Sequence, residues 1–202
     1  MKLKTFLFLL VACFFFQTIL QGNAVFDRHV SPEYVLIADT IIKEMAQKLS
    51  KRYEMKVIGE KTGMAKCINL VGLRFQKLGP LSKEKLREIL VDCVEEFLQA
   101  LNSNEKLRPH LKMYPFTSEG LDIAIFLVDA SGEEIYDPDI GVASAYEGII
   151  SYKTTDRNNI YGYKNRIEEN YDTALNIVKG EKRSNTNLTS KDSSKPWDLG
   201  SS

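Results

Sequence analysis

The chain has 202 residues, of which 44% are hydrophobic and 27% charged, with 27 basic and 27 acidic side chains. This length suits one domain with a substantial core and does not suggest two. The balanced charge gives no electrostatic argument for a nucleic-acid partner, nor for a strongly basic protein that lies on membranes.

The first residues predict an export signal. Lys2 and Lys4 give a positive start, and the run Thr5–Leu20 is almost wholly apolar. The small residues Gly22–Ala24 follow at the spacing that signal peptidase uses. Because the run is shorter than the ~20 residues that cross a bilayer comfortably, we expect residues 1–24 to be a signal peptide, cleaved at its end.

Two other interpretations of this segment stay open. Leu10–Cys13 fits a bacterial lipoprotein signal, in which Cys13 would be acylated and become the first residue. Against it, the apolar run continues through Phe14–Phe16, and the signal would be unusually short. In the third interpretation the segment stays uncleaved as a thin membrane anchor. All three predict an exported protein, whether periplasmic, secreted or envelope-anchored, that meets a membrane only through this segment.

The first half of the chain predicts two strong helices and a strand between them. Ser31 and Pro32 open a helix that we place at 31–53, because serine is a good N-cap and proline suits the first helical position. Ser82 caps the second, which has one continuous apolar stripe and should stop near 102–104. Between them, 66–78 alternates like a strand. Two shorter elements are expected there as well: a strand at 55–58 and a turn at 59–63.

The second half predicts three strands and a helix. Leu121–Val128 is apolar on both faces apart from Asp122, which indicates a central strand. Two more strands are expected at 140–145 and 148–154, with a tight turn between them, and then a helix from Ile167 to Val178. Residues 180–202 are almost without apolar side chains, which is typical of a disordered polar tail.

This order of elements predicts an α+β fold: a small, largely antiparallel sheet with two to three amphipathic helices packed on one face. We expect it to form a single domain over residues 25–179. Two cysteines lie in that domain, Cys67 and Cys93. In an oxidising compartment they could form one disulfide, or they could be two separate buried thiols, the interpretation that the apolar stripe around Cys93 favours.

The sequence contains no recognisable catalytic, cofactor or metal motif. The stretch Gly59–Gly63 with Lys66 lacks the spacing of a phosphate-binding loop. The acidic segment 129–139 does not match a calcium-binding EF-hand loop. The two histidines, His29 and His110, lack the spacing of a zinc protease. We therefore predict no catalytic residue, no cofactor and no metal.

Aromatic residues provide the main evidence for a binding function. Tyr114 and Phe116 lie in a polar connector, and Trp197 lies in the predicted tail. Exposed together, they could form an interaction surface, since aromatic side chains are enriched at interfaces. We therefore expect a non-enzymatic binding or envelope-associated module, with an unidentified protein or envelope component as its partner and no nucleic acid.

An enzyme is the alternative. It would be a small extracytoplasmic hydrolase whose polar site is assembled from distant residues, such as His110, Asp122 and Asp137.

Several short patterns resemble uncharacterised exported proteins of intracellular, chlamydia-related bacteria. They are Gly63–Ala65 before a strand, the capped helix ending at Asn102, Arg108–Pro109, and Tyr114–Phe116. The resemblance covers about residues 31–155. It implies export and a bacterial source, and it implies no activity and no functional residues.

Overall fold

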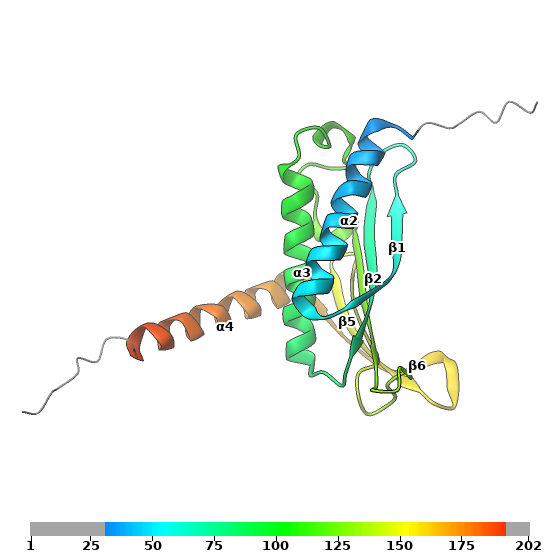
Figure 1. Ribbon diagram of the computed structural model, residues 1–202. Coiled ribbons are helices and arrows are strands. Elements are labelled where there is room, and N and C mark those ends of the chain that lie inside the picture. The colour runs from blue at the N-terminus through cyan, green and yellow to red at the C-terminus, as the bar shows by residue number, and fades with distance from the viewer. Residues whose placement is uncertain (1–30, 193–202) are drawn as a thin grey trace, which may run out of the picture. The chain divides into compact units, whose positions relative to one another are not determined.

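Six strands form one sheet and lie in it in chain order, from β1 to β6 (Figure 1). The computed structural model describes residues 31–192, with side chains placed at 31–159 and 162–181. The main elements are α2 (Glu33–Tyr53), β1 (Lys56–Gly63), β2 (Leu70–Leu78), α3 (Lys83–Ser103), β3 (Leu121–Val128), β4 (Val142–Tyr146), β5 (Ile149–Asp156), β6 (Asn159–Asn170) and α4 (Tyr171–Asp192). Two short 3-10 helices, Arg108–His110 and Ser118–Gly120, lie between α3 and β3.

Neighbouring strands are antiparallel except for β2 and β3, which are parallel. A parallel pair needs a crossover connection, and α3 provides it. Strands β3 to β6 then follow as a meander. The predicted α+β fold with a largely antiparallel sheet is therefore confirmed.

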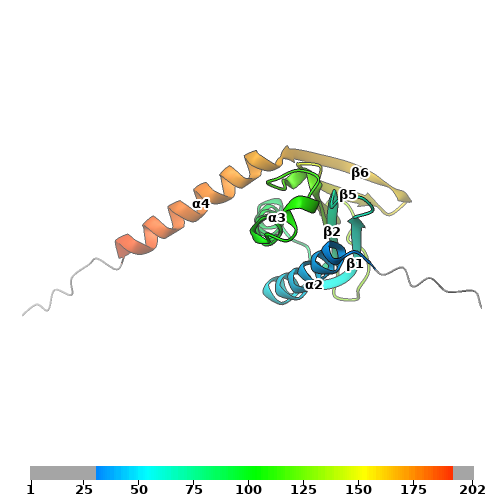
Figure 2. The ribbon, with the colours of Figure 1, turned by 90° about the horizontal axis from the view of Figure 1, so that it is seen from above.

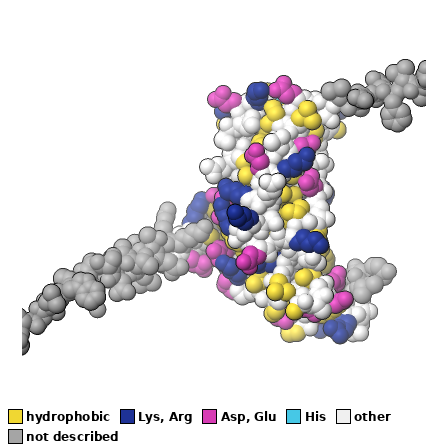
Figure 3. Space-filling view, viewed as in Figure 1, with side chains coloured by type: hydrophobic (Ala, Val, Ile, Leu, Met, Phe, Trp, Pro, Cys, Tyr) yellow, Lys and Arg dark blue, Asp and Glu magenta, His cyan; other side chains and the backbone are white. Residues whose placement is uncertain are grey.

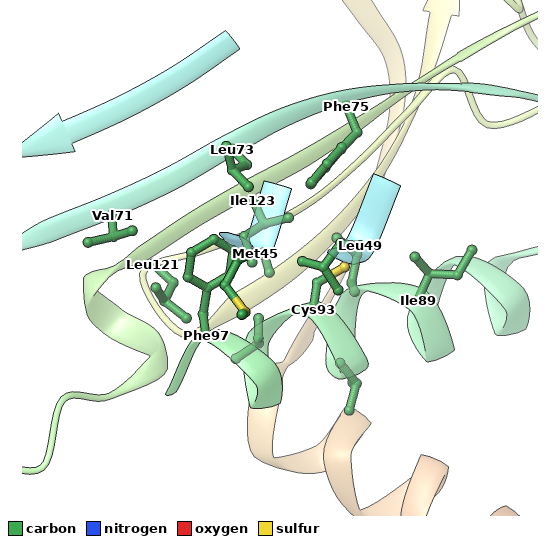
Figure 4. Close-up of a cluster of buried hydrophobic side chains, with 14 of the residues drawn as sticks. Met45, Leu49, Val71, Leu73, Phe75, Ile89, Cys93, Phe97, Leu121 and Ile123 are labelled. Atoms are coloured by element: carbon green, nitrogen blue, oxygen red, sulfur yellow. The ribbon is translucent and has the colours of Figure 1, made fainter. Parts of the chain in front are cut away.

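The core lies between one face of the sheet and the helices. Alternate side chains of β2 and β3 point to this side, and Phe97 and Leu49 meet them from α3 and α2 (Figure 4). Figure 2 shows α2 and α3 on the same side of the sheet. The labelled core residues of Figure 4 are Met45, Leu49, Val71, Leu73, Phe75, Ile89, Cys93, Phe97, Leu121 and Ile123.

Helix α3 matches its prediction closely. The Ser82 side chain accepts a hydrogen bond from the Lys85 backbone N–H at 3.2 Å, as an N-cap does. The predicted apolar stripe is buried along its whole length. The opposite side of the helices is polar, and Figure 3 shows basic and acidic side chains interspersed over it. Some of these charges join the helices: Arg52 of α2 pairs with Asp92 and Glu96 of α3.

The predicted turn at 59–63 is wrong, because those residues belong to β1. Gly59 pairs with Arg74, Gly63 pairs with Leu70, and the strand is interrupted only by a bulge at Ile58. The turn lies later, in 64–69. Glycines are frequent in turns, but here they occupy an edge strand, where the lack of a side chain is tolerated.

The second correction concerns the end of the chain. Residues 159–170, which include Ile167, form strand β6 rather than part of the final helix. An edge strand has only one pairing neighbour and needs few apolar residues, so its pattern is weak. Helix α4 begins at Tyr171 and runs to Asp192, which extends it into the predicted tail; residues 193–202 lie outside the described part. Extending an existing helix is far easier than nucleating one, so polar residues can continue it without a core.

A buried ion pair fastens α3 to β6. The Arg87 guanidinium donates to both carboxylate oxygens of Glu169, at 2.8 and 3.0 Å, and the Tyr152 hydroxyl donates to the same carboxylate at 2.6 Å. Burial raises the pKa of Glu169, but the hydrogen bonds from Arg87 and Tyr152 outweigh it and leave the pKa lowered. Removing one partner of such a pair leaves the other charge unpaired in a buried site, which destabilises the fold.

We expect Glu169→Gln to lower the free energy of unfolding by about 3 kcal/mol at neutral pH. The pair stabilises the fold above the unfolded-state pKa of Glu169, and this contribution is lost as the pH falls through the lower folded-state pKa. The difference in the free energy of unfolding between the wild type and Glu169→Gln should therefore become smaller in acid. Urea unfolding measured from pH 7 downward will show this. Lys85→Ala, which removes an exposed pair with Glu88, is the matched control and should cost less than about 0.5 kcal/mol. A gap that stays constant with pH would contradict the assignment.

Candidate functional site

The face of the sheet away from the helices carries the candidate site. Because side chains alternate along a strand, the register places residues of different strands in rows across this face. One row runs through Gln76, Phe126, Val142, Lys153 and Arg166, from β2 to β6. We call it the pocket row.

A pocket of about 450 Å³ opens on this row. Phe126 and Val142 form its floor, and Ile58 at the bulge of β1 and Tyr163 of β6 stand at its sides. Ile58 is 46% exposed and Tyr163 51% exposed, so both present apolar surface to solvent. The lining mixes apolar side chains with polar groups, and pockets of this size and mixed lining occur as small-molecule sites.

The loop 129–141 forms a further wall of the pocket and is held firmly. The Thr155 hydroxyl donates to the Ile135 carbonyl at 2.6 Å, and the Asp137 backbone N–H donates to the Thr155 carbonyl at 3.0 Å. Lys164 pairs with the Asp137 carboxylate at 2.7 Å. These contacts tie the loop to β5 and β6, so the wall is formed before any ligand arrives.

The acids of this loop stabilise its own backbone. The Asp129 carboxylate accepts hydrogen bonds from the backbone N–H groups of Ser131 and Glu133, at 2.8 and 3.1 Å, and from the Ser131 hydroxyl at 2.6 Å. Within residues 31–159 and 162–181, no group of three or more acidic, histidine or cysteine side chains is arranged to hold a metal ion.

A polar cluster adjoins the pocket row on the same face. The Asp122 carboxylate binds the Arg74 guanidinium through two hydrogen bonds, at 2.8 and 2.7 Å, and the Lys61 ammonium at 2.8 Å. Burial raises the pKa of Asp122, but the hydrogen bonds from Arg74 and Lys61 outweigh it and leave the pKa lowered. The Lys61 ammonium also lies 5.2 Å from the centre of the Tyr146 ring. Two cations thus share one carboxylate.

The row between this cluster and the pocket has short side chains. Ala124, Ser144 and Ser151 lie side by side on β3, β4 and β5, with Arg74 at one end of the row and Glu168 at the other. The two serine hydroxyls share a hydrogen bond of 2.9 Å. All three small residues are buried, so larger neighbours dominate what this face offers to solvent.

The structure separates the residues of the predicted interaction surface. Tyr114 is exposed, and the Arg108 guanidinium lies 4.5 Å from its ring centre. Phe116 is buried, which corrects the prediction. Its backbone binds the Asn102 side chain through both N–H and carbonyl, at 2.6 and 3.0 Å, and its ring packs so tightly on Gly120 that a Cβ there would overlap it. Trp197 and the lipidation candidate Cys13 lie outside the described residues.

The proposed hydrolase residues do not meet. His110 stacks on Tyr34 with ring centres 4.4 Å apart, Asp122 belongs to the polar cluster, and Asp137 binds Lys164 in the loop. No hydrogen bond or ion pair joins any two of the three within the described part of the chain. The pocket residues Phe126, Val142 and Tyr163 were missed because they are far apart in the sequence. The one available signal was the apolar character of β3 on both faces.

Comparisons with known proteins add no identity: no protein-family model, no curated protein and no solved structure matches this chain. Among the described residues, no helix is both long enough and apolar enough to cross a membrane. The fold and the site define an α+β protein with helices on one face of its sheet and a partly apolar pocket on the other.

Removal of the carboxylate of the polar cluster should destabilise the fold. Asp122→Asn should lower the free energy of unfolding by about 2 kcal/mol, because Arg74 and Lys61 would then face each other without a negative charge. Chemical unfolding at neutral pH measures this. Asp137→Asn, in the more exposed pair with Lys164, is the matched control and should cost under about 1 kcal/mol. Equal losses in the two variants would argue against a special role for the cluster.

The cysteines predict unequal reactivity. Both are free thiols; Cys93 is fully buried on α3 and burial raises its pKa, whereas Cys67 is partly exposed. Since the thiolate is the reactive form, a thiol reagent should label Cys67 in the folded protein and reach Cys93 only after unfolding. Mass spectrometry after timed labelling checks this, with Cys67→Ser as the control. A protein that takes up no reagent even when unfolded would instead contain the disulfide.

Proposed function

We propose that this protein is a non-enzymatic, exported binding module that holds a small apolar or amphipathic molecule on the helix-free face of its sheet. The observation that carries the proposal is the pocket on the pocket row, with Phe126 and Val142 as its floor. A sheet whose other face is fully packed needs no apolar residues on this side for its core. Apolar residues gathered in a concavity there are more typical of a ligand site.

The local structure supports a preformed site. The loop 129–141 is tied to β5 and β6 by the Thr155 and Lys164 contacts. This wall of the pocket therefore loses little conformational entropy when a ligand binds. Apolar side chains form the floor of the pocket and polar groups share its lining, which favours an amphipathic ligand. The exposed side chain of Tyr114 offers a separate contact site for a protein partner. Phe116 is buried and does not contribute to that site.

The cellular setting rests on the N-terminal sequence. Lys2, Lys4 and the apolar run Thr5–Leu20 support export, and the resemblance to exported bacterial proteins is in keeping with it. The proposed hydrolase gains no support from the positions of His110, Asp122 and Asp137, which bind separate partners. A binding or envelope-associated role therefore stands as the better proposal.

An uncharged fluorescent dye tests the pocket. We expect N-phenylnaphthylamine to bind the full-length protein and its fluorescence to rise. Ile58→Glu should weaken binding at least about tenfold, because it removes apolar wall and places a charge beside the pocket. The matched control is Leu36→Glu on α2: Leu36 is 53% exposed, much like Ile58, but lies away from the pocket.

Comparison of Ile58→Glu with the control Leu36→Glu shows whether the dye binds in the pocket. If both variants keep their circular dichroism and only Ile58→Glu loses the dye, the pocket is the binding site. If the wild type does not bind the dye, or if both variants bind it equally well, the proposal is wrong.

A further inference from the structure

The pocket row contains a half-buried cation, Lys153. It lies across from Val142 of the pocket floor on one side and from Arg166 on the other. Its ammonium sits 4.8 Å from the ring centre of Tyr163, which forms a side of the pocket. Among the described side chains it makes no salt bridge.

Three other cations of this face bind carboxylates. Arg74 and Lys61 bind Asp122, and Arg166 binds Glu168. The charged groups that act on Lys153 are Arg166, Glu168, Asp122 and Arg74, and burial together with Arg166 lowers its pKa. Together with Lys153 these are three cations and two carboxylates, so the charge around Lys153 is positive overall.

Partial burial of the Lys153 ammonium without a counter-ion costs free energy. The group loses part of its hydration, and among the described side chains the ring face of Tyr163 is the only contact that compensates for this. A carboxylate brought by a ligand would restore a charge-assisted hydrogen bond there. The apolar part of the same ligand would then extend along the row over Val142 and Phe126.

The pocket also has an acid, and its position gives the ligand a direction. Glu134 lines the pocket from the loop that pairs with Val128 at the end of β3. An anionic head group is repelled on that side and attracted on the side of Lys153. Lys153, which lies beside the pocket against Tyr163, and Glu134, which belongs to the lining, thus favour one orientation.

We propose that the pocket binds a single molecule of an anionic amphiphile, such as a medium-chain carboxylate, with its head group on Lys153 and its chain on Phe126 and Val142. This inference rests on the proposed function, because it names the ligand class of the same pocket. It assigns to Lys153 a ligand-binding role.

Displacement of bound N-phenylnaphthylamine from the full-length protein tests the inference. The competitors are decanoate, decanol and decylamine, which share a chain and differ in head-group charge, each kept below the concentration at which it forms micelles. We expect decanoate to bind at least about tenfold more tightly than decanol. Lys153→Gln should weaken decanoate by roughly ten- to a hundredfold and leave decanol and the dye unchanged. Lys85→Gln, on the helix side, is the matched control and should change nothing.

The outcomes separate the two proposals. If the dye fails to bind the wild type, the pocket proposal falls and the ligand class with it. If the dye binds and Ile58→Glu removes it, but Lys153→Gln binds decanoate as well as the wild type does, the pocket stands and the carboxylate class is wrong. If decylamine binds most tightly, Glu134 rather than Lys153 holds the head group, and the inference is overturned.

Discussion

The packing of helix α3 against the sheet is the interaction on which the rest of this structure depends. Its nine buried side chains pack on the sheet over β3 and β4, and the helix itself lies in the connection from β2 to β3. The same helix is joined by specific polar contacts to α2, β6, α4 and the connector that follows it. Glu96 binds Arg52 of α2, Arg87 binds Glu169 of β6, Glu95 accepts a hydrogen bond from Tyr171 of α4, and Asn102 fixes the connector at Phe116.

This arrangement explains why the two faces of the sheet differ. The apolar stripes of the helices all pack on one face of the sheet, so the other face of the sheet is in contact with water. It is suited to this by the Asp122 cluster and by small residues such as Ser144 and Ser151, whose hydroxyls satisfy each other. The pocket row departs from that design at Phe126 and Val142. That departure is the reason for placing function there, because no requirement of the core explains it.

The sequence predicts the parts of this fold that have a strong local pattern. Ser82 and the stripe behind it define α3, and the unbroken apolar run of Leu121–Val128 defines a central strand. Strand β6 and the strand character of Gly59–Gly63 escape prediction because edge strands are stabilised by pairing with a neighbour rather than by their own pattern. Phe116 appeared to be a surface residue because its burial depends on Gly120 and Asn102, contacts that only the fold creates. The pocket is harder still to predict, since the register of six strands brings its residues together.

The order of the strands also bears on how the chain reaches this structure. The six strands are joined to their neighbours by local connections except at one place, the parallel pairing of β2 with β3, where everything between Leu78 and Leu121 must first be looped out. Short-range pairings form quickly, whereas closing a long loop costs entropy before any contact repays it. The hairpin of β1 and β2 and the meander from β3 to β6 are therefore two pieces that can form independently. Joining the two pieces also brings α3 into place, because that helix lies in the connection between β2 and β3.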